Sequence, residues 1–122
     1  MTTSTRRLRD MDLVLTNLVI GPLFFLVSFA LYRWPPAKIN YFYGYRTPRS
    51  MRSQRHWNEA NQYSGWVGIW VSVVVTFAQL VTFYSHSPRA ALNVGVGLLL
   101  AGLIAVIVLT ERRLKTQFPP EA

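Results

Sequence analysis

Three long apolar segments alternate with polar, basic segments along this chain. The apolar segments cover residues 11–32, 66–84 and 90–110, and Asp12 is the one charged residue within them. A helix that crosses a bilayer needs about 20 mostly apolar residues, and each segment comes close to that length. The pattern therefore predicts an all-α membrane protein with three transmembrane helices.

The same pattern predicts how these helices are arranged. Gly21-Pro22 lies within the first span, where the proline removes a backbone hydrogen bond and should kink the helix. Only residues 85–89 separate the second span from the third, which indicates an antiparallel hairpin. Small residues repeat every four positions in both spans, and we expect the two stripes to meet, Gly68, Ser72 and Thr76 against Gly97, Ala101 and Ala105.

A polar segment, residues 33–65, joins the first span to the second. Thr47 can cap a helix and Pro48 suits the first helical position, so we expect a helix over residues 48–64. One face of this helix would carry Arg49, Arg52, Arg55, His56 and Glu59, and the other Ser50, Ser53, Gln54, Trp57, Asn61 and Ser64. The segment is thus predicted to hold a basic amphipathic helix that packs its second face on protein, with a solvated basic linker as the alternative.

Two basic ends flank a single membrane domain, residues 11–110. Residues 1–10 form a polar N-terminal tail that we expect to be mobile, and residues 111–122 form a basic C-terminal tail. Nine lysines and arginines lie in the first loop and the C-terminal tail, against four in the N-terminal tail and the second turn. Because cytoplasmic loops carry the excess of basic residues, we expect the C-terminus in the cytoplasm and the N-terminus outside, although three N-terminal arginines argue against this.

The charge and composition of the chain limit the classes of partner that it is expected to bind. The formal net charge is +8 while 51% of the residues are hydrophobic, and the basic blocks lie between the apolar ones. This segregation favours membrane lipids with anionic headgroups as partners of the arginine-rich loop. No DNA- or RNA-binding motif of the usual kinds is present, so no nucleic-acid partner is expected. With no cysteine and two histidines, we expect neither a metal site nor a cofactor.

The spans offer amides rather than catalytic groups. No ionisable side chain lies at mid-depth and no catalytic arrangement can be proposed, so we do not expect an enzyme. Three amides lie near the membrane face opposite the arginine loop, namely Asn17, Gln79 and Asn93. Because amides in lipid seek one another, we expect them to form an intramembrane polar cluster that joins three helices. The alternative is a recognition patch that is reachable from outside.

Glu59 is the acid of the loop region, and Arg46 and Arg55 are its candidate partners. Arg55 lies one helical turn before Glu59, and Arg46 precedes the expected helix and can reach back to it. We expect one of the two to form an internal ion pair with Glu59. Arg49 and Arg52 would then face headgroups or a partner.

The polar segment resembles the signature of the SdpI family of bacterial integral membrane proteins. The resemblance covers residues 39–66 and rests on Asn40, Gly44, Tyr45, Arg46, Thr47, Pro48, Ser50, Trp57, Ala60, Asn61 and Gly65. It implies a small bundle of transmembrane helices in the bacterial cytoplasmic membrane, with this motif between the first and second spans as a structural or binding unit.

The name-giving member of that family protects a cell from a secreted peptide toxin and holds a transcriptional repressor at the membrane. The resemblance therefore implies a non-enzymatic immunity or resistance protein that binds a peptide toxin or protein partner. An accessory or structural subunit of a larger membrane complex is a second hypothesis. A small transporter is a third, which spans without intramembrane charge disfavour unless the chain forms a homo-oligomer.

Overall fold

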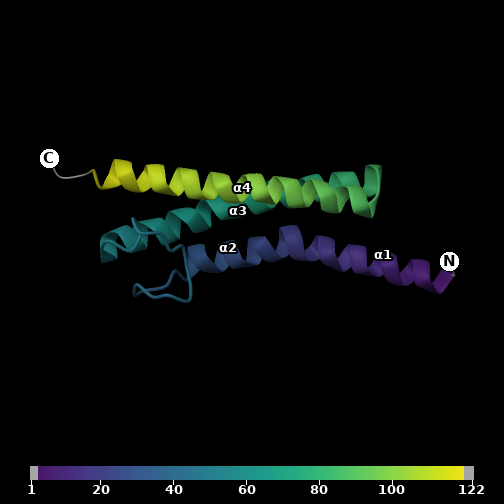
Figure 1. The fold of residues 1–122 in the computed structure, drawn as a ribbon, viewed down its shortest axis with the longest axis horizontal. Coiled ribbons are helices and arrows are strands. Elements are labelled where there is room, and N and C mark those ends of the chain that lie inside the picture. The colour runs from purple at the N-terminus through teal and green to yellow at the C-terminus, as the bar shows by residue number, and fades with distance from the viewer. Residues whose placement is uncertain (1–2, 120–122) are drawn as a thin grey trace.

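The computed structural model describes residues 3–119, which form an elongated bundle of three helical rods (Figure 1). The first rod consists of α1 (Thr3–Leu18), a π-helical turn η1 (Val19–Leu23) and α2 (Phe24–Arg33). A short turn joins α3 (Gln54–Ser85) to α4 (Pro88–Gln117) in an antiparallel hairpin. All three rods are long and apolar enough to cross a membrane, so the predicted fold class is confirmed.

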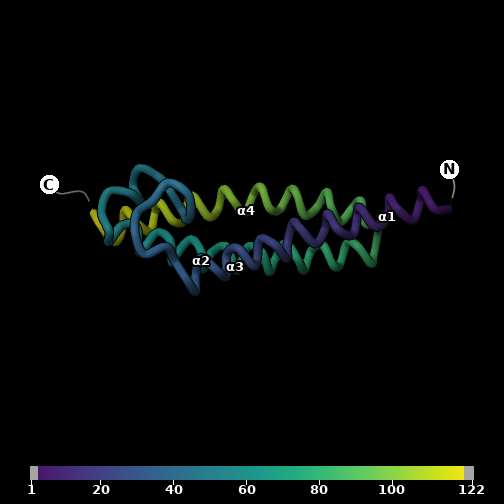
Figure 2. Tube along the Cα trace, turned by 90° about the horizontal axis from the view of Figure 1, so that it is seen from below, coloured from purple at the N-terminus to yellow at the C-terminus, as the bar shows by residue number. Residues whose placement is uncertain are grey.

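The first rod crosses the hairpin rather than running parallel to it. α2 packs beside α3, and α1 then passes across and contacts α4 (Figure 2). The N-terminal turns of α1 extend beyond the α3–α4 turn in both views. The loop of residues 34–53 lies at the opposite end of the bundle, beside the start of α3 and the end of α4 (Figure 1). The start of α1 and the end of α4 therefore lie at opposite ends of the molecule.

The first rod changes direction at Gly21 and Pro22, where the sequence predicts a kink. Proline has no N–H to donate, and residues 19–23 form a single π-helical turn. A β-carbon at the buried Gly21 would lie 2.6 Å from Gln79 Oε1 and 3.1 Å from Thr76 Cα. The glycine therefore allows the bent rod to approach α3 closely.

The interior of the bundle mixes polar and apolar side chains, and its exterior is mostly apolar. Ser72 and Thr110 are fully buried, whereas the side chains of Leu26, Phe77 and Ile104 are more than half exposed. Lipid chains are as apolar as these side chains, so helices in a bilayer associate through close packing and hydrogen bonds rather than through an apolar core. This distribution is the one expected of a bundle that lipid surrounds.

Glycines allow the rods to approach one another, but on faces that differ from the predicted ones. Gly65 and Gly68 of α3 face the first rod rather than α4, and a β-carbon at Gly65 would lie 2.7 Å from the backbone nitrogen of Tyr32. Gly68 lies against Ser28 of α2. The predicted contact between the α3 stripe and α4 is therefore wrong.

The packing face of α4 also differs from the predicted one. Gly97 and Ala101 are exposed, whereas the buried residues of the membrane-spanning part are Ala91, Gly95, Gly102, Val106 and Thr110. At about 100° per residue, Gly97 lies about 200° around the helix from the buried Gly95, so the two glycines point to opposite sides of α4. The spacing of small residues alone therefore selected the wrong side of α4.

Both terminal helices are longer than predicted. α1 begins at Thr3 and α4 continues to Gln117, so most of each predicted tail is helical. Neither extension contains glycine or proline, and their arginine, leucine and lysine residues are good helix formers. Residues 1–2 and 120–122 of the predicted tails lie outside the described residues.

The predicted helix over residues 48–64 is wrong at its start. Residues 48–53 form turns, and α3 begins at Gln54 with Ser53 as its N-cap, whose Oγ accepts a hydrogen bond from His56 N at 3.2 Å. From Gln54 the helix is continuous to Ser85, so the rest of the expected loop helix forms the first turns of α3.

We expect Gly65→Ala to lower the free energy of unfolding in detergent by about 1–3 kcal/mol, because the new methyl group would overlap the backbone of α2. Gly97→Ala is the matched control, since no atom of the described chain lies within 4 Å of its β-carbon position. Helix propensity should make that control neutral or up to about 1 kcal/mol stabilising. Equal effects of the two substitutions in a denaturant titration would contradict the assigned α2–α3 contact.

Candidate functional site

The motif loop, residues 34–53, folds around the side chain of Asn61. This residue of α3 is fully buried, and its Oδ1 accepts a hydrogen bond from the Tyr45 backbone N–H at 2.6 Å. Its Nδ2 donates to the carbonyl of Trp57 at 2.9 Å. The amide therefore ties the end of the loop to α3 and pairs the Tyr45 N–H, a backbone group that no helix pairs.

Gly44 is required at the residue before this contact. Its φ is 110°, a value that residues with a β-carbon rarely adopt. A β-carbon there would also overlap Asn61 Oδ1 and lie 2.9 Å from Pro36 Cγ. Both the backbone conformation and the space against Asn61 therefore demand glycine.

Side chains from the first turns of α3 hold the beginning of the loop. The indole Nε1 of Trp57, which is fully buried, donates to the Pro36 carbonyl at 2.8 Å. Gln54 Nε2 donates to the Ala37 carbonyl at 2.6 Å. Within the loop, Asn40 Oδ1 accepts from the backbone N–H groups of residues 42 and 43 at 2.9 and 2.8 Å, which closes a local turn. The loop conformation is thus set by side chains rather than by secondary structure.

Thr47 and Ser50 explain why the chain does not become helical at Pro48. The Thr47 N–H donates to Ser50 Oγ at 2.8 Å, and the Ser50 N–H donates to Thr47 Oγ1 at 3.1 Å. Such bonds from hydroxyls to nearby backbone groups compete with the helical pattern. Ser50 is fully buried, so this turn forms part of the packed loop.

Glu111, near the end of α4, connects the loop to the helical hairpin. Its Oε1 accepts hydrogen bonds from Tyr45 OH at 2.8 Å and Thr47 Oγ1 at 2.7 Å, and its Oε2 accepts one from Arg49 Nε at 3.1 Å. Burial raises the pKa of the Tyr45 phenol, and its hydrogen bond to Glu111 raises this pKa further. The phenol therefore remains a donor at neutral pH, and three loop residues share one carboxylate.

The predicted ion pair of Glu59 with Arg46 or Arg55 is wrong. Glu59 Oε1 instead accepts a hydrogen bond from Arg113 Nε of α4 at 2.8 Å. The guanidinium of Arg55 lies 5.4 Å from the centre of the Phe118 ring, and Arg46 is exposed. α4 supplies the nearer partner because the hairpin brings its last turns beside the first turns of α3.

The loop arginines therefore divide into two groups. Arg49 pairs with Glu111 and so does not face headgroups or a partner freely, as was expected of it. Arg46, Arg52 and Arg55 are exposed, as is Lys38 on the same loop. The predicted single arginine face of one helix is therefore not formed. Arg46 and Arg52 lie in the loop, and Arg55 lies in the first turn of α3.

Three contributors to this site were missed by the sequence reasoning because they lay in the predicted basic tail. They are Glu111 and Arg113, in the last turns of α4, and Phe118, which directly follows the helix. One signal could have found the first of them, since Glu111 is the only acid of α4 and directly follows its apolar segment. The positions of Arg113 and Phe118 depend on helix packing and left no pattern.

At the other end of the bundle, two of the three predicted amides meet. Gln79 Nε2 donates to Asn17 Oδ1 at 2.9 Å, and Asn17 Nδ2 donates to the Pro88 carbonyl at 3.2 Å. Asn93 is exposed, so its predicted place in the cluster is wrong, because the packing face of α4 is turned away from it. The joined pair connects the first rod to both α3 and the start of α4.

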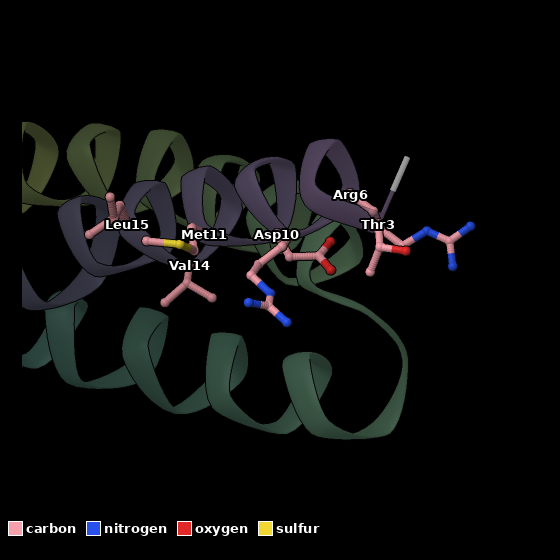
Figure 3. Close-up of a pocket in the computed structure, with 7 residues that line it drawn as sticks. Thr3, Arg6, Asp10, Met11, Val14 and Leu15 are labelled. Carbon is pink, nitrogen blue, oxygen red and sulfur yellow. The ribbon is translucent and has the colours of Figure 1, made fainter. Parts of the chain in front are cut away.

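A hollow of about 180 Å³ lies beside the amide pair, between the first rod and α3, with Val14, Pro22 and Tyr84 among its lining residues. A second, open hollow follows the N-terminal turns of α1, from Thr3 to Leu15 (Figure 3). Side chains of α1 alone line the second hollow, which makes it a furrow of one helix rather than a built site. The loop end is where residues of several elements converge on common partners.

Comparison with known proteins matches a region that includes most of the motif loop and all of α3. Residues 37–110 match the model of the SdpI/YfhL protein family. The chain is 38% identical over 101 residues to Uncharacterized protein YfhL of Bacillus subtilis (strain 168), an alignment that covers 83% of this chain and 87% of that protein. No solved structure gives a significant match.

We expect Tyr45→Phe and Glu111→Gln to be coupled in a double-mutant cycle of detergent stability. Each single change should cost about 1–2 kcal/mol, because each removes or weakens bonds around the Glu111 carboxylate. The double mutant should be more stable than the sum predicts by about 0.5–2 kcal/mol, since the two residues share a hydrogen bond. Strict additivity would contradict the assigned link between the loop and α4.

Proposed function

The chain belongs to the SdpI/YfhL protein family, and we propose that it is a non-enzymatic, multi-pass protein of the bacterial cytoplasmic membrane that acts by binding a peptide toxin or a protein partner. Three apolar rods provide the membrane anchorage. The motif loop is the proposed recognition surface.

One observation carries this proposal: within the motif, neutral side chains are buried whereas several arginines are exposed. Ser50, Trp57 and Asn61 are buried and consumed in internal packing and hydrogen bonds. The cations Arg46 and Arg52 are exposed on the loop that those residues fix. Exposed cations on a loop of fixed shape favour recognition of an anionic group.

The tip of the loop suits the membrane surface. Phe42 is 94% exposed and Tyr41 is 76% exposed, and the exposed Lys38 lies close to them in the sequence. Aromatic and basic side chains together favour the headgroup layer, where each basic residue contributes about 1 kcal/mol of attraction to anionic lipid. We propose that the tip rests in anionic headgroups and that the arginines are presented to the partner at that level.

The chemistry of the surface defines the partner as one that offers carboxylates or another anionic group. A peptide toxin with such groups would make the chain an immunity or resistance protein, as membership of the family favours. A large membrane complex bound through the same arginines would instead make it an accessory subunit. We further propose that this surface is cytoplasmic and the N-terminus external, on the excess of basic residues at the loop end.

Replacing the three exposed arginines in Arg46→Gln/Arg52→Gln/Arg55→Gln should weaken partner binding and protection while the protein remains folded. At about 1 kcal/mol for each charge, the affinity should fall roughly a hundredfold. The measurements are growth in spent medium that contains membrane-active peptides, and quantitative mass spectrometry of partners cross-linked in native membranes.

The matched control is Arg6→Gln/Arg7→Gln/Arg9→Gln, which removes the same charge from the exposed start of α1 at the other end of the bundle. It should retain both protection and partner. If both triple variants lost protection and partner binding equally, the loop arginines would contribute only net charge, and the proposal would be wrong. Loss of a stoichiometric large complex in the loop variant alone would select the accessory-subunit function.

Cysteine labelling tests the proposed orientation, and the absence of native cysteine leaves no background. His86→Cys in the exposed α3–α4 turn should react with an impermeant maleimide in intact cells. Lys38→Cys on the exposed loop should react only after permeabilisation. The reverse pattern would place the motif loop outside the cell.

A further inference from the structure

A third hollow, with charged and polar side chains in its lining, lies at the loop end of the bundle, where all three rods meet. It has a volume of about 300 Å³, and six side chains line it, from α2 (Tyr32), α3 (Glu59, Gln62, Tyr63 and Trp66) and α4 (Arg113). Glu111 and its loop partners do not line it. The hollow is therefore a separate feature from the loop network.

An acid and a base lie side by side in this hollow with bonding capacity to spare. Arg113 uses Nε to reach Glu59 Oε1 at 2.8 Å. Among residues 3–119, neither the terminal Nη groups of Arg113 nor Oε2 of Glu59 has a further hydrogen-bond partner, and both side chains are partly exposed. The pair thus offers cationic donors and an anionic acceptor next to each other.

Tyr63 lies beside those donors. The guanidinium of Arg113 lies 5.1 Å from the centre of the Tyr63 ring. A guanidinium can stack on an aromatic ring and still present a planar fork of N–H groups, which suits two oxygens of a phosphate. The exposed amide of Gln62 adds a further donor at the edge of the hollow.

The aromatic residues of the hollow, Tyr32 and Trp66, indicate how deep it lies in the membrane. Tyr32 ends the first apolar segment and Trp66 begins the second, and their ring centres lie 5.9 Å apart. Trp66 also packs against Trp70, one turn further into the apolar part of α3. Tryptophan and tyrosine prefer the boundary between headgroups and acyl chains, so the charged pair lies at headgroup level and the rings lead towards the acyl layer.

We propose that this hollow binds the headgroup of a zwitterionic, amine-bearing phospholipid of the phosphatidylethanolamine type. The phosphate oxygens accept hydrogen bonds from the Nη groups of Arg113, and the primary ammonium donates to the free oxygen of Glu59. The acyl chains run along Trp66 and Trp70.

The two charges of the pair explain why the lipid should be zwitterionic and should carry N–H groups. A choline headgroup has no N–H to donate to Glu59, and a glycerol headgroup brings no cation to it. Anionic lipid is attracted instead to the exposed arginines of the loop, which are other residues. The hollow and the loop tip therefore select different lipids at the same membrane face.

Native mass spectrometry of the full chain, released from vesicles of equal parts phosphatidylethanolamine, phosphatidylcholine and phosphatidylglycerol, tests the proposal. The wild type should retain phosphatidylethanolamine over phosphatidylcholine. Glu59→Gln should reduce that preference about fivefold, the effect of losing roughly 1 kcal/mol at a partly exposed site, without reducing retained phosphatidylglycerol. Arg113→Lys keeps the charge but loses the planar fork, and should lower retention of both zwitterionic lipids.

Arg112→Gln is the control, because this exposed neighbour of Arg113 does not line the hollow. It should keep the wild-type preference, and melting curves of all variants should show that they are folded. Equal retention of phosphatidylethanolamine and phosphatidylcholine by the wild type would overturn the proposal. So would identical lipid profiles for Glu59→Gln and Arg112→Gln. Should Glu59→Gln unfold, an unchanged profile in Arg113→Lys would overturn it.

Discussion

The bond between the buried amide of Asn61 and the backbone of Tyr45 is the contact on which the loop end of the molecule depends. It fixes the position at which the loop leaves Gly44, and thereby the direction of the Tyr45 phenol towards Glu111. Thr47 and Arg49 then follow within reach of the same carboxylate. The second half of a loop without secondary structure is ordered in this way by two side chains, Asn61 of α3 and Glu111 of α4.

The bilayer accounts for the rest of the architecture. In hydrocarbon, backbone groups must pair within helices, and helices attract one another only where they pack closely or exchange hydrogen bonds. Gly65 and Gly68 provide the close approach of the first rod, and the Asn17–Gln79 pair provides the polar contact near the opposite face. The buried polar contacts and the apolar exterior therefore both follow from having lipid as the solvent.

How far the sequence predicts this structure follows from which interactions are local. The three spans could be predicted because their length and apolarity are properties of each segment alone. The partner of Glu59 could not, because Arg55 is near in sequence whereas Arg113 is brought near by the hairpin. The same limit applies to Asn93, whose exposure depends on how α4 is rotated. The motif residues lie together at the loop end, but their individual hydrogen bonds could not be predicted without the fold.

α4 is an unbroken helix of 30 residues, about 45 Å long. At its first residue the Pro88 carbonyl accepts a bond from Asn17, and near its far end Glu111 holds three loop residues. Asn17 and the motif loop therefore both contact one continuous helix, one near each membrane face. A displacement of α4 along its axis would move both contacts together.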